Sequence, residues 1–106
     1  MNKITIAKEV YDKTPQEFKN LTDDTDYTLT KVESKNPAST RVSAGQTVSG
    51  DLRIVSVQGD PAVSVIRGLT TGIRTSPIVK VLDKTETTIT FETEGGVYRL
   101  EKGDSQ

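Results

Sequence analysis

The chain has 106 residues and a net charge of −1, and it contains neither cysteine nor histidine. This composition excludes disulfides, thiolate zinc sites, cysteine nucleophiles and serine–histidine catalysis. Leu, Ile, Val and Phe form about a quarter of the residues, above the roughly 20% below which chains stay disordered. We therefore expect a single folded domain over residues 1–106, with a modest core to which ligand binding or pairing between copies would add stability.

Thr, Val and Ile make up about a third of the chain, which favours strands because β-branched side chains pack well on a pleated surface. Near the amino end, Ile4, Ile6 and Val10 alternate with polar residues and predict a first strand over residues 3–10. This end lacks an apolar signal core, and no run in the chain reaches transmembrane length. We therefore expect a cytoplasmic protein.

A short helix is predicted over residues 15–21, where helix-start signals precede two apolar residues. Thr14 suits the N-cap, Pro15 suits the first helical position, and Glu17 completes a capping box. The two apolar residues expected to be buried are Phe18 and Leu21.

The middle of the chain is predicted to hold strands separated by turns. The expected strands are residues 27–32, 52–57, 62–66 and 78–82. The 52–57 segment has apolar residues at both parities, so it is expected to be buried on both faces. Gly59-Asp60-Pro61 would turn the chain into the next strand, and the polar residues 34–47 predict the longest loop.

The chain is predicted to end in a hairpin of strands 88–93 and 97–101, closed by Gly95-Gly96. Two glycines suit this loop because a two-residue primed turn needs positive φ. The expected cross-strand pairs are Phe91 with Leu100, Thr93 with Tyr98, and Glu92 with Arg99. The expected buried face consists of Ile89, Phe91, Tyr98 and Leu100.

Six or seven short strands at spacings of about 8–12 residues predict an all-β fold. We expect a small barrel or sandwich with one short N-terminal helix, which would cover an open end or a sheet face.

The acidic run Asp23, Asp24 and Asp26 is a candidate for binding a hard cation. If Asp24 were the first ligand of a calcium loop, the sixth position would be Leu29 instead of Gly and the twelfth Lys35 instead of Glu. The run is better interpreted as a solvated helix end, so neither a metal nor another cofactor is predicted.

Nucleic-acid binding by arginines and tyrosines on a barrel face is a second possibility that the charge balance disfavours. The residues concerned are Arg41, Arg53, Arg67, Arg74 and Arg99, with Tyr27 or Tyr98 for base stacking. The chain has 15 acidic and 14 basic residues and no basic block. A partner made of nucleic acid is therefore not expected.

The stretch from Arg67 to Ser76 is the most suggestive candidate binding site. Its candidate ligand-binding residues are Arg67, Thr70, Thr71, Arg74, Thr75 and Ser76. Glycine backbone, hydroxyls and guanidinium groups together can cradle a phosphate, so a nucleotide is the ligand to consider. The stretch lacks the P-loop ending and the dinucleotide pattern. An ordinary turn between strands is favoured, because turns select glycine and serine for backbone reasons alone.

Two segments near the carboxyl end form a recognisable pattern. In residues 74–81 Thr75-Ser76-Pro77 precedes an apolar strand, and in residues 91–100 a glycine turn precedes Tyr98 and Leu100. This pattern resembles the ending of many small proteins of phages and mobile elements. It departs from the usual Gly-Ser before the tyrosine, because Gly95-Gly96-Val97 stands there. The resemblance implies a small accessory β domain and names no activity.

These observations predict a non-enzymatic protein that works by binding. The leading hypothesis is an accessory or inhibitor protein of a phage or mobile element that acts on a host protein. One alternative is a protein that sequesters a nucleotide through residues 67–76. Another is a structural subunit that uses its strand edges for assembly.

Overall fold

The computed structural model describes residues 3–23, 25–34, 45–68 and 71–103, which contain eight strands and two short helices. In chain order the elements are β1 (Thr5–Ile6), the 3-10 helix η1 (Lys8–Lys13), α1 (Gln16–Lys19), β2 (Tyr27–Ser34), β3 (Thr47–Val57), β4 (Asp60–Arg67), β5 (Thr71–Arg74), β6 (Ile78–Lys84), β7 (Thr88–Thr93) and β8 (Gly96–Lys102). The all-β class is confirmed, with eight strands where six or seven were expected and one helix more than predicted.

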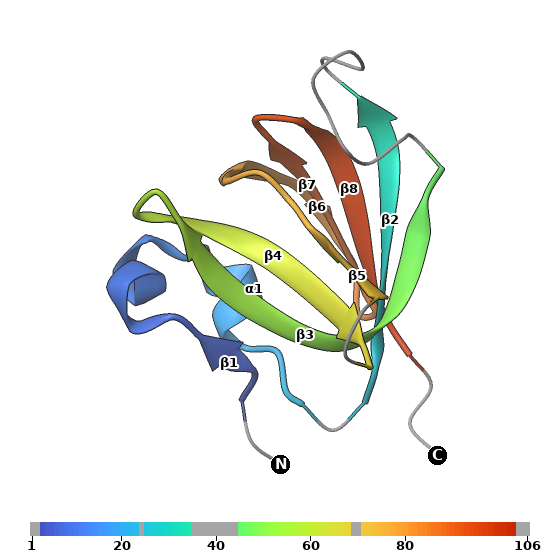
Figure 1. Cartoon of the computed structure of the whole chain (residues 1–106), viewed down its shortest axis with the longest axis horizontal. Helices are drawn as coiled ribbons and strands as arrows, with labels where there is room; N and C mark the ends of the chain where they lie inside the picture. The colour runs from blue at the N-terminus through green and yellow to red at the C-terminus, as the bar shows by residue number, and fades with distance from the viewer. Residues whose placement is uncertain (1–2, 24, 35–44, 69–70, 104–106) are drawn as a thin grey trace.

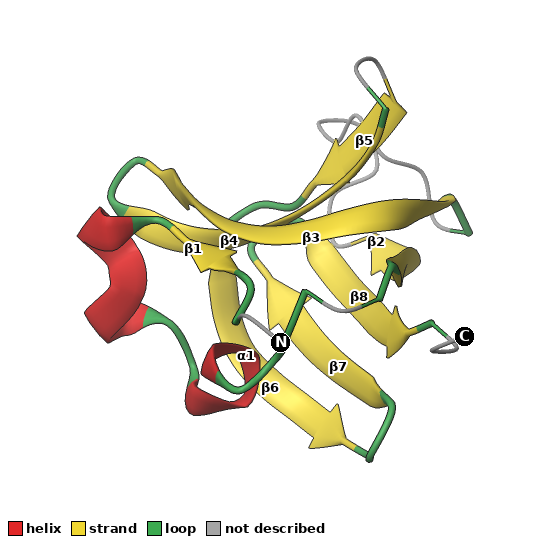
Figure 2. Cartoon of the chain, turned by 90° about the horizontal axis from the view of Figure 1, so that it is seen from below, coloured by secondary structure: helices red, strands yellow, loops and turns green. Residues whose placement is uncertain are grey.

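The strands form one strongly curved sheet in the order β5-β4-β3-β2-β8-β7-β6 (Figure 1). Neighbours in this order are antiparallel, and β1 pairs in parallel with β3. The long strand β3 pairs with β2 through residues 47–50 and with β4 through residues 51–57, so it belongs to both halves of the sheet. The two helices lie together at one end of the curved sheet (Figure 2).

Three aromatic rings form the centre of the core. The rings of Phe18 in α1 and Phe91 meet edge to face with 5.3 Å between centroids, and Phe91 stacks on Tyr98 at 5.8 Å. All three side chains are buried, as predicted for each of them. Leu21 is only half-buried and packs against the outside of this cluster. The short helix thus seals the interior of the sheet through Phe18.

The predicted first strand over residues 3–10 is wrong beyond Ile6. The chain pairs with β3 only at Thr5 and Ile6, and then turns into η1. Val10 is nevertheless fully buried. Ile6 and Val10 are four residues apart, and this spacing places two side chains on one side of either a strand or a helical turn. The apolar pattern therefore could not distinguish the two.

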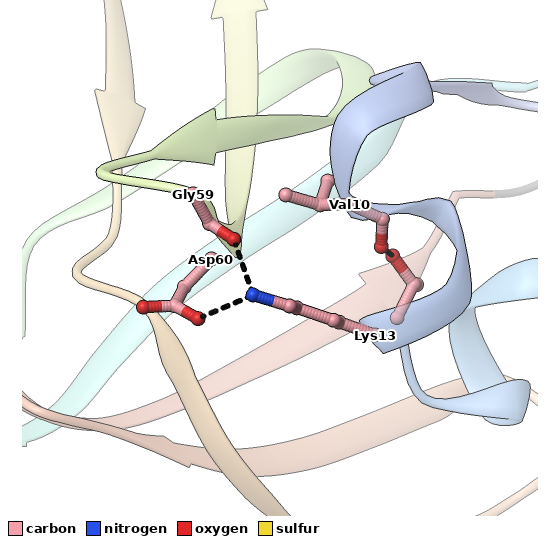
Figure 3. A network of polar contacts seen from close by, with 5 residues as sticks. Val10, Lys13, Gly59 and Asp60 are labelled. Carbon is pink, nitrogen blue, oxygen red and sulfur yellow. Dashed lines mark hydrogen bonds and ion pairs between the residues drawn. The ribbon is translucent and has the colours of Figure 1, made fainter.

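The η1 helix is held against the turn between β3 and β4 by Lys13. Its ammonium group donates to the Gly59 carbonyl at 3.0 Å and lies 3.6 Å from the Asp60 carboxylate (Figure 3). Both charged side chains are more than half exposed, so this ion pair stabilises the fold by no more than about 1 kcal/mol.

The predicted capping box at the start of α1 does not form. Pro15 occupies the N-cap position of α1, and no side chain makes a capping hydrogen bond there. Thr14 instead ends η1, and its buried hydroxyl donates to the Val10 carbonyl at 2.8 Å. The reason is the preceding helical turn, whose free carbonyl groups compete for the hydroxyl.

We therefore expect substitutions at Thr14 and Glu17 to have different effects. Thr14→Val removes the buried hydrogen bond to the Val10 carbonyl and should destabilise the protein by about 1 kcal/mol, whereas Thr14→Ser keeps the hydroxyl. Glu17→Ala should change the stability by less than about 0.5 kcal/mol. Urea unfolding of the three variants measures these changes in the free energy of unfolding. A large loss of stability in Glu17→Ala would indicate that the capping box forms after all.

The hairpin of β3 and β4 differs from the prediction in burial and in its turn. Burial alternates from Val48 to Ile54, and residues 55–57 are half-buried, so β3 is not covered on both faces. Val57 lies opposite Asp60, and the two loop residues are Gln58 and Gly59. Both have positive φ, 53° and 84°, as a primed two-residue turn requires.

The carboxyl-terminal hairpin forms with its predicted buried face and a different register. Phe91 lies opposite Tyr98, Ile89 opposite Leu100 and Thr90 opposite Arg99, so the predicted pairs are wrong. The loop is Glu94-Gly95, one residue earlier than expected, because the Thr93 hydroxyl accepts hydrogen bonds from the N–H groups of Gly95 and Gly96. This shifts the pairing by two positions. Since the side-chain period of a strand is also two, the buried face is unchanged.

Candidate functional site

The predicted binding stretch lies on the hairpin of β4 and β5 and does not converge on one point. Arg67 is opposite Thr71, and Arg74 is opposite Ser64. Because side chains alternate between the faces of a strand, Arg67 lies on the face of Val65 and Ile73 whereas Arg74 lies on the other face. Both arginines are exposed, on opposite sides of the hairpin.

The hydroxyl residues of the same stretch have different surroundings. Thr75 is buried, where its Oγ1 accepts a hydrogen bond from the Val63 N–H at 3.1 Å and donates to the Ser76 carbonyl at 2.8 Å. Its hydroxyl is therefore used in holding the end of β5 to β4. Thr71 is exposed and Ser76 half-buried, while Thr70 lies outside the described residues.

A hollow of about 570 Å³ lies on the outward face of β3, β4 and β5 beside Arg74. It is lined by Gln46, Val55, Ser64, Ile66, Gly72, Ile73 and Arg74. Ser64 has a small side chain and Gly72 has none, so they form the bottom of the hollow, and beside them Ile66 is 38% exposed. The hollow thus combines apolar walls with one cation. Only Arg74 among its lining residues was a predicted site residue, because the hollow depends on the pairing of three strands.

No strand of the described residues pairs with β5 on its side away from β4, and this edge presents two sets of backbone groups beside the hollow. The Thr75 N–H donates to the Val63 carbonyl at 2.8 Å, which makes these two residues a hydrogen-bonded pair of the antiparallel ladder. Such pairs alternate with pairs that do not exchange hydrogen bonds. Counting back along the register, Gly72 and Arg74 therefore direct their N–H and C=O groups away from β4. Since β5 ends the strand order, these groups face outward.

The opposite edge of the sheet, β6, has an irregular backbone that disfavours pairing with a further strand. Its register against β7 shifts twice, so that Val79 and Leu82 are the additional residues of two β-bulges. Both side chains protrude, with 53% and 46% of their surface exposed. Bulges and charged side chains are the usual protection of an edge strand, and β6 carries both. The pairing of β5 with β4 shows no shift of register.

Two of the other sequence candidates are placed in or near the core. Tyr27 and Tyr98 are buried, so neither ring is available to stack on a nucleic-acid base. The Tyr27 hydroxyl donates to the Thr22 carbonyl at 2.9 Å. Asp24 and Arg41 lie outside the described residues. Within the described ranges, no group of three or more acidic residues could hold a metal ion together.

Lys31 is a buried cation on the inner face of β2. Only 1% of its surface is exposed, and its ammonium group lies 5.6 Å from the centroid of the Tyr98 ring. Burial lowers the pKa of Lys31 and raises the pKa of Tyr98, since a low-dielectric environment disfavours the charged form of each.

We expect Lys31 to make the stability depend on pH. Its pKa is lower in the folded state than the ordinary value of 10.5, so just below pH 10.5 the unfolded chain binds more protons. The free energy of unfolding should therefore rise with pH in that window. Above pH 10 the raised pKa of Tyr98 acts in the opposite direction, so denaturation should be measured from pH 7.5 to 10. Lys31→Met should abolish the rise. Lys80→Met, on the exposed β6 edge, should keep the rise of stability with pH. If both variants lost this rise equally, Lys31 would not be its origin.

Comparison of the chain with protein-family models, with curated proteins and with solved structures gave no match. Neither helix of the described segments is long and apolar enough to cross a lipid bilayer.

Proposed function

We propose that this chain is a non-enzymatic binding protein that captures a partner protein at the free edge of β5. We further propose that it is a cytoplasmic accessory or inhibitor protein of a phage or mobile element that acts on a host protein. Its carboxyl-terminal resemblance to small accessory β domains supports the accessory role. The observation that carries the proposal is the difference between the two edges of the sheet. β6 is interrupted by two bulges, whereas β5 is regular and borders a hollow.

Addition of a strand to a sheet edge suits this geometry. Backbone hydrogen bonds at such an edge supply affinity, and a neighbouring hollow that receives alternate side chains supplies specificity. Gly72 and Arg74 provide the outward backbone groups, and the hollow lies on the same face as the Arg74 side chain. The β6 edge provides no regular ladder for a partner strand.

A proline at position 74 tests the proposal. The Arg74 N–H points away from β4, so Arg74→Pro removes a donor that the fold does not use, and proline is tolerated on an edge strand in this orientation. Arg74→Ala is the matched control, because it removes the side chain and keeps the donor. The wild type should capture a partner protein from lysate of the cells in which the protein naturally occurs. The proline variant should capture none of it, and the alanine variant should capture a reduced amount. Equal capture by wild type and the proline variant, with both folded, would place the interface elsewhere.

Sequestration of a nucleotide is one alternative. Arg67 and Arg74 lie on opposite faces of the hairpin, so they do not form one phosphate site, and this arrangement disfavours it. Calorimetry with mono-, di- and cyclic nucleotides at millimolar concentration should give no heat. Assembly of copies through strand edges is the other alternative, and sedimentation velocity of the wild type and Arg74→Pro tests it. A dimer that dissociates in the proline variant would favour assembly.

A further inference from the structure

We propose that the partner segment is an extended strand with an acidic residue followed, two positions later, by a large apolar residue. This inference rests on the proposed function and specifies the chemistry of the partner. It assigns the acidic residue to the position opposite Arg74 and the apolar residue to the position opposite Gly72, in a strand antiparallel to β5.

We assign the antiparallel direction because antiparallel pairing is slightly more stable per residue than parallel pairing. In an antiparallel ladder each hydrogen-bonded pair exchanges two bonds, so Gly72 and Arg74 would each form a closed pair with the incoming strand. These positions are two residues apart, so the side chains opposite them lie on the same face. That face is the outward one, which carries the hollow.

The position opposite Gly72 has room for a large side chain. Gly72 presents no side chain, and its cross-strand neighbour on β4 is the partly exposed Ile66. A large apolar group above Gly72 would cover Ile66, which lines the hollow. Aromatic side chains opposite a glycine are a known way of stabilising a sheet edge. An isoleucine that is exposed in the free protein would then be buried in the complex.

The position opposite Arg74 selects an acidic residue. Residues 61–76 contain two arginines and no acidic residue, so β4 beyond Asp60 and the whole of β5 carry only positive charge. On the neighbouring strand β3, Asp51 and Arg53 offset each other. Opposite charges directly across two strands stabilise pairing, and like charges destabilise it. A second copy of this chain would bring its own Arg74 to the same edge, which disfavours self-pairing.

Selection of peptides from a random decapeptide library displayed on yeast tests the inference without knowledge of the natural partner. The immobilised wild-type protein should enrich sequences with Asp or Glu two positions before an aromatic or large aliphatic residue. Arg74→Glu should bind these peptides about tenfold more weakly and should select Lys or Arg at the first position instead. Arg67→Glu is the matched control, because Arg67 lies on the other face, and it should keep the acidic preference.

The outcomes separate this inference from the proposed function. Peptides that are enriched without charge preference, and lost with Arg74→Pro, would overturn the acidic–apolar pattern and leave strand addition intact. An acidic preference that Arg67→Glu inverts and Arg74→Glu keeps would overturn the assignment of faces. No enrichment above the Arg74→Pro background would overturn both. A wild-type dimer that Arg74→Pro dissociates would make a second copy the occupant and would also overturn the inference.

Discussion

Replacing Phe91 by alanine should destabilise the protein by about 3–5 kcal/mol, which is a large part of the stability of a domain this small. The Phe91 side chain is fully buried, packs edge to face with Phe18 and stacks on Tyr98. Its removal leaves a cavity at the point where α1 meets the sheet, and the surrounding backbone is fixed by strand pairing on both sides. The variant should unfold at a much lower urea concentration than the wild type.

Leu82→Ala is the matched control for this substitution. It also shortens a large apolar side chain, but Leu82 is half-exposed at a bulge of the edge strand β6. We expect a change of less than about 0.5 kcal/mol. If the two variants were equally destabilised, the aromatic cluster would not be the centre of the core. If Phe91→Ala were folded and as stable as the wild type, the assignment of its face would be wrong.

The buried faces of the strands could be predicted from sequence, and the registers could not. Ile89, Phe91, Tyr98 and Leu100 share a buried face because their parity fixes it, whatever the loop. The loop itself depended on one hydroxyl, that of Thr93, which bonds two N–H groups and moves the turn by one residue. A sequence pattern records which side chains are apolar, but it does not record this local competition for hydrogen bonds.

The bulges of β6 show a second limit of the sequence pattern. Ile78 and Val81 both pack against the core, and they are three residues apart. This spacing does not match the strand period of two, and the segment is too short for the spacing to indicate a helix. Two residues stand between them, and both point outward because Val79 is the additional residue of a bulge. Only pairing with β7 determines that outcome, and this pairing is a long-range property.

The candidate site illustrates the same limit for function. Arg74 attracted attention in the sequence because it lies near glycines and hydroxyls, which suggested a phosphate cradle. The register places it opposite Ser64 and on the other face from Arg67, so the two cations are separated by the hairpin itself. The edge position of β5 and the exposure of Ile66 follow from the order of strands in the sheet. No local pattern carries that information.

Gly50→Ala should destabilise the protein by about 3 kcal/mol, through crowding instead of a cavity. At Gly50 the strand β3 changes partner, since Gly50 pairs with Tyr27 of β2 and the next residue pairs with Ile66 of β4. A methyl group at this position would overlap the Ile66 carbonyl group. Backbone atoms cannot rotate away as a flexible side chain can, so β4 would have to move.

Gly59→Ala is the control that separates crowding from backbone conformation. Gly59 has a φ of 84°, and nothing lies within 4 Å of an added methyl group, so only the conformational cost of about 1–2 kcal/mol applies. In urea unfolding, Gly50→Ala should therefore have a lower free energy of unfolding than Gly59→Ala. The functional consequence should differ as well, because moving Ile66 displaces both a wall of the hollow and the strand that supports β5. Under conditions where both variants are folded, Gly50→Ala should lose peptide binding and Gly59→Ala should retain it. Full binding by folded Gly50→Ala would show that Ile66 does not contribute to the site.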